Sequence, residues 1–114
     1  MITVYGMKNC TTVRKATKWL DDHNIDYNSH DYKKSGVDIP FLKKAMDDHG
    51  WDVIINKNST TWRTLPDHEK DEMTREQAEL LADAKPSVIK RPIIDTDKSI
   101  IVGFNEDVYK DTLL

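Results

Sequence analysis

The sequence predicts an α/β protein whose mixed four-stranded sheet is built in the order β-α-β and then β-β-α. Three observations support this fold class. Near the N-terminus, a short apolar run leads into a helical pattern and then into a second extended segment. Near the C-terminus, two extended runs are separated by a short polar turn and followed by a last helix. The residues between these two halves show helical spacing and helix-capping residues.

The first half of the sheet is expected to come from residues 2–5 and from a strand within residues 25–32. A helix over residues 12–23 is predicted between them. Its apolar residues recur at i, i+3 and i+7: Val13, Ala16 and Leu20. Asn24 follows as a residue that tolerates the left-handed conformation at a helix end. Two strands joined by a helix are expected to be parallel, with a right-handed crossover.

Residues 38–85 are predicted to form a helical insertion between the two halves of the sheet. Asp38, residues 59–61 and Thr74 are suited to cap three successive helices. The acidic stretch at residues 67–72 is expected to be solvated surface. The insertion therefore adds helices between the two halves of the sheet.

The second half of the sheet is predicted as a hairpin of residues 92–95 and 99–102, followed by a helix that begins at Asn105 or Glu106. The hairpin adds antiparallel strands to the parallel pair, so the sheet is mixed. This order of elements is the thioredoxin arrangement. We expect residues 1–114 to form a single domain of this fold.

Composition excludes several classes of protein. The net charge is −3 and no basic stripe is present, so direct nucleic-acid binding is not expected. No segment is apolar enough for a membrane helix, and no signal peptide is recognisable. One cysteine excludes an internal disulfide and zinc sites of several cysteines, so no metal site is expected. We expect a cytoplasmic protein that is a monomer by default.

The single cysteine, Cys10, lies where the first strand meets the first helix. The first amides of a helix have no internal partner and carry partial positive charge, which stabilises a thiolate and lowers its pKa. The hydroxyls of Thr11 and Thr12 and the charges of Lys8 and Arg14 are expected to act in the same direction. The alternative is a small buried side chain that fills the junction.

A reactive Cys10 is expected to work as a monothiol, because Val13 occupies the place of the second cysteine of a dithiol motif. Its adduct with an oxidised substrate must then be resolved by an outside thiol such as glutathione or a glutaredoxin. Hydrolysis by a cysteine–histidine pair is a competing possibility, but the spacing of the four histidines singles none out. Arg63 and Arg91 are candidates to bind a carboxylate or oxyanion, with surface salt bridging as the alternative.

Four stretches carry a family resemblance across almost the whole chain. They are residues 4–6 with 8–12, 31–34, 56–57 with 60–65, and 89–94 through 102–107. Through them the chain resembles the arsenate-reductase-like family that includes ArsC, Spx and the YffB-type proteins. The short length and the Thr-Thr-Trp-Arg segment at residues 60–63 are most similar to the YffB branch.

The resemblance implies a thioredoxin-like fold with a helical insertion and a set of functional residues. Cys10 matches the nucleophilic cysteine of the family, and Arg91 matches the arginine before a cis-proline, here Pro92. Arg63 is similar to the arginine that helps to bind the oxyanion in arsenate reductases. The predicted substrate- or glutathione-binding residues are Arg91, Pro92, Arg63, Asn9, Thr11 and Thr12.

The chain also departs from the family in two places. Arsenate reductases carry a further arginine after the hairpin, and no positive charge lies around residues 102–103, which argues against arsenate as the substrate. Val13 removes the second cysteine of the Spx motif. The expected function is a glutathione-dependent monothiol oxidoreductase that acts on a small anionic or thiol-adduct substrate, without a tightly bound cofactor. The alternative is an Spx-like regulator that binds a protein partner such as RNA polymerase, with Cys10 vestigial or sensory.

Overall fold

The computed structural model describes residues 1–114, which fall into two compact units. The sheet unit comprises Met1–Tyr32 and Arg91–Leu114, and the helical unit comprises Lys33–Lys90. The helical unit begins and ends a few residues outside the insertion predicted at residues 38–85. Whether the chain acts as a single domain stays a prediction.

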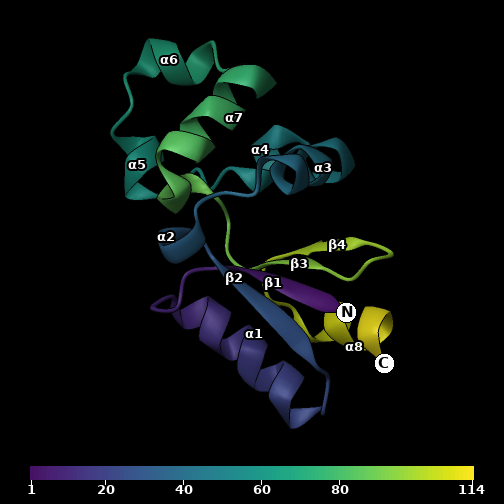
Figure 1. Ribbon diagram of the computed structural model, residues 1–114. Coiled ribbons are helices and arrows are strands. Elements are labelled where there is room, and N and C mark those ends of the chain that lie inside the picture. The colour runs from purple at the N-terminus through teal and green to yellow at the C-terminus, as the bar shows by residue number, and fades with distance from the viewer. The chain divides into compact units, whose positions relative to one another are not determined.

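The sheet unit contains one sheet with the strand order β2-β1-β3-β4 (Figure 1). β1 (Ile2–Gly6) pairs in parallel with β2 (Tyr27–Asp31) and antiparallel with β3 (Ile93–Asp95). β3 pairs antiparallel with β4 (Ile100–Val102). The predicted mixed four-stranded sheet is therefore confirmed, with β1 and β3 as its inner strands.

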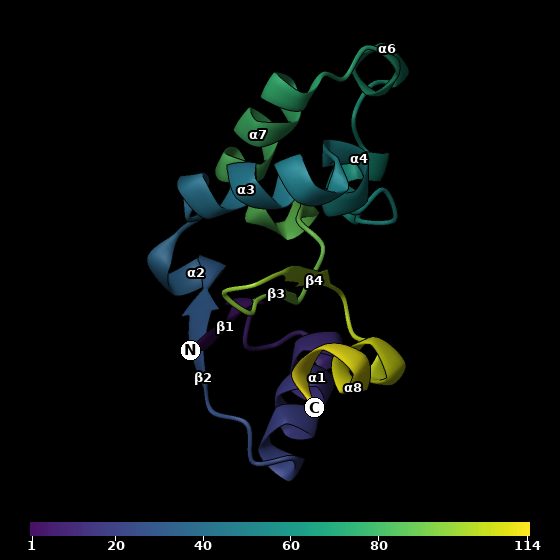
Figure 2. The same ribbon diagram turned by 90° about the vertical axis from the view of Figure 1, so that its right-hand side faces the viewer.

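Two helices of the sheet unit, α1 (Thr11–Asp22) and α8 (Glu106–Leu113), pack on the same face of the sheet (Figures 1 and 2). Asn24 adopts the expected left-handed conformation after α1, with φ of 56°. Asn105 caps α8 by accepting a hydrogen bond from the Val108 amide. The core between sheet and helices consists of buried residues from both: Val4, Ala16, Trp19, Leu20, Ile94, Ile101 and Tyr109.

The buried Tyr109 links α8 to the loop that follows β4. Its hydroxyl donates a hydrogen bond to the Gly103 carbonyl oxygen at 2.7 Å. The Gly103 amide in turn donates to the Pro92 carbonyl oxygen at 2.7 Å. Burial raises the pKa of the Tyr109 phenol, so this group stays a neutral donor. The core and the segment before β3 are thus connected by two hydrogen bonds.

Removing the Tyr109 hydroxyl is expected to destabilise the chain modestly. Tyr109→Phe keeps the ring that packs against Trp19 and Phe104 but leaves the Gly103 carbonyl without this donor. We expect a loss of about 1 kcal/mol in the free energy of unfolding, measured by urea denaturation. If the urea midpoint and the denaturant slope (m-value) are both unchanged, this hydrogen bond does not contribute to stability.

The helical unit consists of short helices. They are α2 (Tyr32–Ser35, which starts at the last residue of the sheet unit), α3 (Ile39–His49), α4 (Trp51–Ile54), α5 (Thr60–Arg63), α6 (Asp67–Asp71), α7 (Arg75–Ala84) and the 3₁₀ turn η1 (Pro86–Val88). The predicted caps are present: Asp38 accepts from the Phe41 amide, Ser59 accepts from the Trp62 amide, and Thr74 forms a capping box. None of the helices of the chain is both long and apolar enough to cross a membrane.

Three of these short helices were not expected. α2 and α4 are not predicted by the sequence, and α6 occupies the acidic stretch that was expected only to be surface. None of the three exceeds five residues, which is too short for an apolar period to emerge. The α6 stretch is still exposed, since none of its residues is buried.

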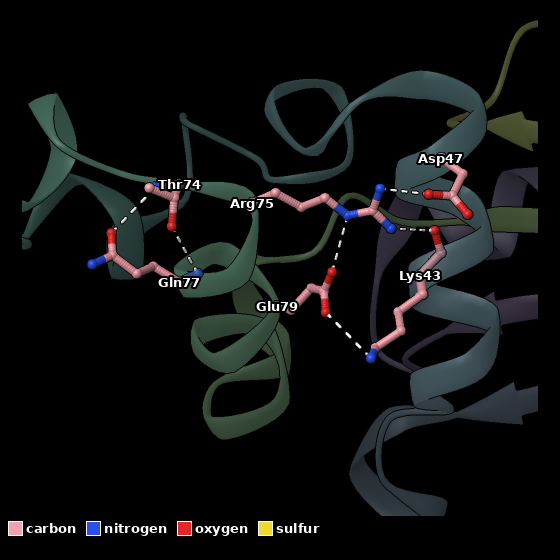
Figure 3. A network of polar contacts seen from close by, with 6 residues as sticks. All are labelled: Lys43, Asp47, Thr74, Arg75, Gln77 and Glu79. Carbon is pink, nitrogen blue, oxygen red and sulfur yellow. Dashed lines mark hydrogen bonds and ion pairs between the residues drawn. The ribbon is translucent and has the colours of Figure 1, made fainter.

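A network of polar contacts joins α3 to α7 (Figure 3). The Arg75 guanidinium donates to the carboxylates of Asp47 and Glu79 and, at 2.9 Å, to the Lys43 carbonyl oxygen. The Lys43 ammonium lies 3.8 Å from the second oxygen of Glu79. One guanidinium therefore binds groups on both helices.

Arg75→Met is expected to lower the melting temperature by a few degrees, because it removes all of these hydrogen bonds. The groups are partly exposed, so we expect salt to screen the attraction and to reduce the difference from the parent chain. Thermal unfolding at low and high salt tests this. Lys44→Met is the matched control, because it removes an α3 cation that forms no ion pair. Equal effects of the two substitutions would contradict a role for the network.

Candidate active site

The junction between β1 and α1 requires a residue without a side chain. A Cβ atom built on Gly6 would lie 2.7 Å from Cγ2 of Val13, closer than carbon atoms approach in packed proteins. Glycine therefore lets the first turn of α1 lie directly against the end of β1. A turn follows, in which the Cys10 amide donates to the Met7 carbonyl oxygen at 3.2 Å.

Cys10 is the N-cap residue of α1. Its backbone is extended, with φ of −88° and ψ of 125°, and its carbonyl oxygen accepts the first hydrogen bond of the helix from the Arg14 amide at 3.1 Å. Its side chain forms no capping hydrogen bond. The thiol is half-buried and free, so it is neither sealed in the core nor fully in water.

The pKa of the Cys10 thiol is lowered below its ordinary value by its surroundings. Partial burial alone raises this pKa, but the backbone amides of Val13 and Thr12 and the charge and hydrogen bonding of Arg91 outweigh burial. The amides of the first helical turn thus stabilise the thiolate as expected. The pKa of Cys10 is lowered by these amides and by Arg91. A contribution was also expected from the hydroxyls of Thr11 and Thr12 and the charges of Lys8 and Arg14, but these groups are not among the causes of the shift.

Arg91 reaches the thiol from the segment that precedes β3. Its side chain is half-buried, and Nη1 donates a hydrogen bond to Sδ of Met7 at 3.1 Å. The peptide bond between Arg91 and Pro92 is cis, as the resemblance implies. Pro92 itself is fully buried, and its carbonyl oxygen accepts from the Gly103 amide. The guanidinium therefore extends from a segment next to the buried, hydrogen-bonded Pro92 and contacts Met7.

The other predicted site residues lie in two different places. Asn9, Thr11 and Thr12 belong to the turn and first helical residues around Cys10, and all three side chains are exposed. Arg63 belongs to the helical unit, where Nε and Nη2 both donate to the Asn58 carbonyl oxygen, at 3.1 and 2.9 Å. A shared ligand for Arg63 and Arg91 stays a prediction.

Met7 is the residue at this site that sequence analysis missed. A thioether carries no charge and no motif pointed to it, so only its contact with Arg91 reveals its role. No group of three or more His, Cys, Asp or Glu side chains in the chain is placed to hold a metal ion. Around Cys10 the structure brings together one thiol, two backbone amides and one guanidinium.

Comparison with known proteins gives one consistent family. The sequence matches the ArsC family over residues 5–112. It is 33% identical over 109 residues to the global transcriptional regulator Spx of Listeria innocua, which covers 94% of this chain and 82% of that protein.

Solved structures give the same result. The structure of a YFFB protein superposes with a TM-score of 0.95 at 38% identity and covers both chains completely. An arsenate reductase (ArsC) related protein from Brucella melitensis has a TM-score of 0.79 at 40% identity, over 97% of this chain and 92% of that one. By sequence and by fold, this chain belongs to the ArsC family.

Proposed function

We propose that the chain is a monothiol reductase in which Cys10 is the nucleophile and glutathione is the reductant. The observation that carries this proposal is the thiol at the start of α1, whose pKa is lowered by two helix amides and by Arg91. A thiolate is the form of cysteine that attacks disulfides and other electrophiles. Membership of the ArsC family, with a relative described as arsenate reductase related, supports a redox role.

The proposed reaction has two thiol–disulfide exchanges. The Cys10 thiolate attacks the glutathionyl sulfur of a mixed disulfide, forms a Cys10–glutathione disulfide and releases the substrate thiolate. The thiolate of a free glutathione then attacks the glutathionyl sulfur on Cys10, which yields oxidised glutathione and regenerates the Cys10 thiolate. The proton lost by glutathione goes to the substrate thiolate, and the substrate gains two electrons. A glutaredoxin thiol can replace free glutathione in the second step.

We assign anion binding to Arg91, beside the thiol, and we carry Arg63 over from the family resemblance as a second anion-binding residue. A guanidinium binds a carboxylate through two parallel hydrogen bonds, and glutathione carries two carboxylates. We assign Asn9, Thr11 and Thr12 to the rim of the same site because they are exposed around the thiol. Pro92 is assigned to the wall, through the backbone before β3.

The test is turnover of a small glutathione mixed disulfide, measured as the amount of oxidised glutathione that is formed. We expect turnover that depends on both glutathione and Cys10. Arsenate is the second substrate to be tried, and we expect it to be poorer because no cation lies near Gly103. Absence of turnover with either substrate, together with a Cys10 pKa near the free value of about 8.5, would contradict the proposal.

Removing the charge of Arg91 is expected to make the thiol less reactive at neutral pH. Arg91 lowers the pKa of Cys10, so Arg91→Gln raises that pKa, and less thiolate is present near neutral pH. We expect alkylation by iodoacetamide to slow several-fold near neutrality and to reach the parent rate at high pH, where both thiols are ionised.

Arg14→Gln is the matched control for this measurement. It removes an exposed arginine from the same end of α1, and Arg14 is not among the groups that shift the thiol. We expect its alkylation profile to coincide with that of the parent chain. A profile shifted equally by both substitutions would show that Arg91 has no specific role.

A regulatory role is the second candidate, because 33% identity to Spx extends over most of the chain. In this case the fold binds a protein partner such as RNA polymerase and Cys10 is sensory or vestigial. Retention of RNA polymerase by the purified chain, without glutathione-dependent turnover, would favour this candidate over the reductase.

A further inference from the structure

The helical unit contains an open groove lined by residues of α6, of α7 and of the segments beside them. The helices α6 and α7 follow each other along the chain (Figure 1). The groove has a volume of about 300 Å³. Its apolar floor consists of Leu65, Met73, Leu80 and Leu81, and we call it the α6–α7 groove. All of its residues belong to the helical unit, so binding in this groove does not require the Cys10 thiol.

In α7, the buried side chains are small and the larger apolar side chains are exposed or half-buried. Ala78 and Ala82 are completely buried, whereas Leu80 is 71% exposed and Leu81 is half-buried. A single exposed leucine is ordinary on a protein surface. Here, however, Leu80 lines a hollow together with other apolar side chains, which is typical of surfaces that bind a partner.

The rim of the groove is acidic. His68 and Glu69 of α6 and Glu72, the residue that follows this helix, line the groove, and neither Glu69 nor Glu72 forms an ion pair. Residues 65–81 contain six carboxylates and two cations, and one of those cations is Arg75, which binds Asp47 and Glu79. The field around the groove therefore favours a cationic ligand.

We propose that the α6–α7 groove binds a short amphipathic segment of a partner protein, with apolar side chains on the floor and lysine or arginine against Glu69 and Glu72. Apolar anchors on one helical face commonly bind grooves of this kind, and opposite charges on the rim fix their orientation. A small molecule fits less well, because small-molecule sites cover most of their ligand and Leu80 remains largely open here.

The probe for this proposal is a synthetic helical peptide of about 14 residues, with leucines on one face and lysines on the other. It is titrated into the full-length, isotope-labelled chain and followed by amide chemical shifts. We expect shifts centred on residues 65–81 and an affinity that falls as salt is added. A peptide with glutamate in place of every lysine is expected to bind at least about tenfold more weakly.

Two variants distinguish binding in the groove from non-specific electrostatic attraction of a cationic peptide to the chain. Leu80→Lys is expected to weaken binding at least about tenfold. Val108→Lys adds the same charge at another exposed apolar residue, 42% exposed in α8, and is expected to bind like the parent chain. Circular dichroism on both variants verifies that each is folded.

Three results would overturn the proposal: shifts outside residues 65–81, equal binding of the two peptides, or equal affinities of the Leu80→Lys and Val108→Lys variants. Self-association of the parent chain that disappears in Leu80→Lys would also overturn it, because the groove would then bind a second copy. None of these results depends on turnover at Cys10, so the groove and the reductase can fail separately.

Discussion

Cys10→Ser is expected to reduce glutathione-dependent turnover by about a thousandfold or more. A serine hydroxyl does not ionise at neutral pH, and it cannot form the disulfide intermediate. The fold should remain, because serine is a good N-cap and Cys10 forms no capping hydrogen bond. The hydroxyl can accept from the amides that otherwise stabilise the thiolate, so we expect stability to be unchanged or raised by up to about 1 kcal/mol.

The comparison of Cys10→Ser with Cys10→Ala makes this prediction specific. Both variants should lose turnover equally, but only serine can cap α1, so the alanine variant should be the less stable of the two. Urea denaturation measures the difference. Turnover that persists in either variant would remove Cys10 from the mechanism, whatever the stability of the fold.

Gly6→Ala is expected to have the second large effect, on both stability and thiol reactivity. Gly6 does not have a positive φ, so the backbone itself accepts alanine. The added Cβ would lie 2.7 Å from Val13, a β-branched side chain that cannot easily rotate away. We expect a loss of about 1–3 kcal/mol in the free energy of unfolding.

The same substitution should raise the pKa of Cys10. The first turn of α1 must move away from β1, and this turn carries the Thr12 and Val13 amides that lower the pKa. We therefore expect slower alkylation at neutral pH. Relieving the contact with Val13→Ala in the Gly6→Ala background should restore the alkylation profile, and failure of this rescue would disprove the steric cause.

Much of the fold could be predicted from local sequence chemistry. The mixed sheet followed from the placement of short apolar runs, and the caps at Asp38 and Thr74 followed from side chains that bind helix amides. The left-handed Asn24 was predicted on the same basis. In each case the physical cause lies within a few residues of its effect.

The remaining features depend on contacts that sequence patterns do not encode. The helices α4 and α6 have four and five residues, so no apolar period identifies them. The contact between Met7 and Arg91 joins residues 84 positions apart, and nothing in the sequence around either residue predicts it. The position of Cys10 at the start of a helix predicts its lowered pKa. The contribution of Arg91 to that pKa becomes visible only in the structure.

The sheet unit is assembled from segments on both sides of the helical unit, so its parts are synthesised at different times. When residues up to Lys90 have emerged from the ribosome, the whole helical unit is outside but none of β3, which pairs with the inner strand β1. Until the final segment emerges, the nascent protein displays its only sulfhydryl without the guanidinium or the hairpin beside it. Cys10 is thus made before the helical unit, and Arg91 and the hairpin are made after it.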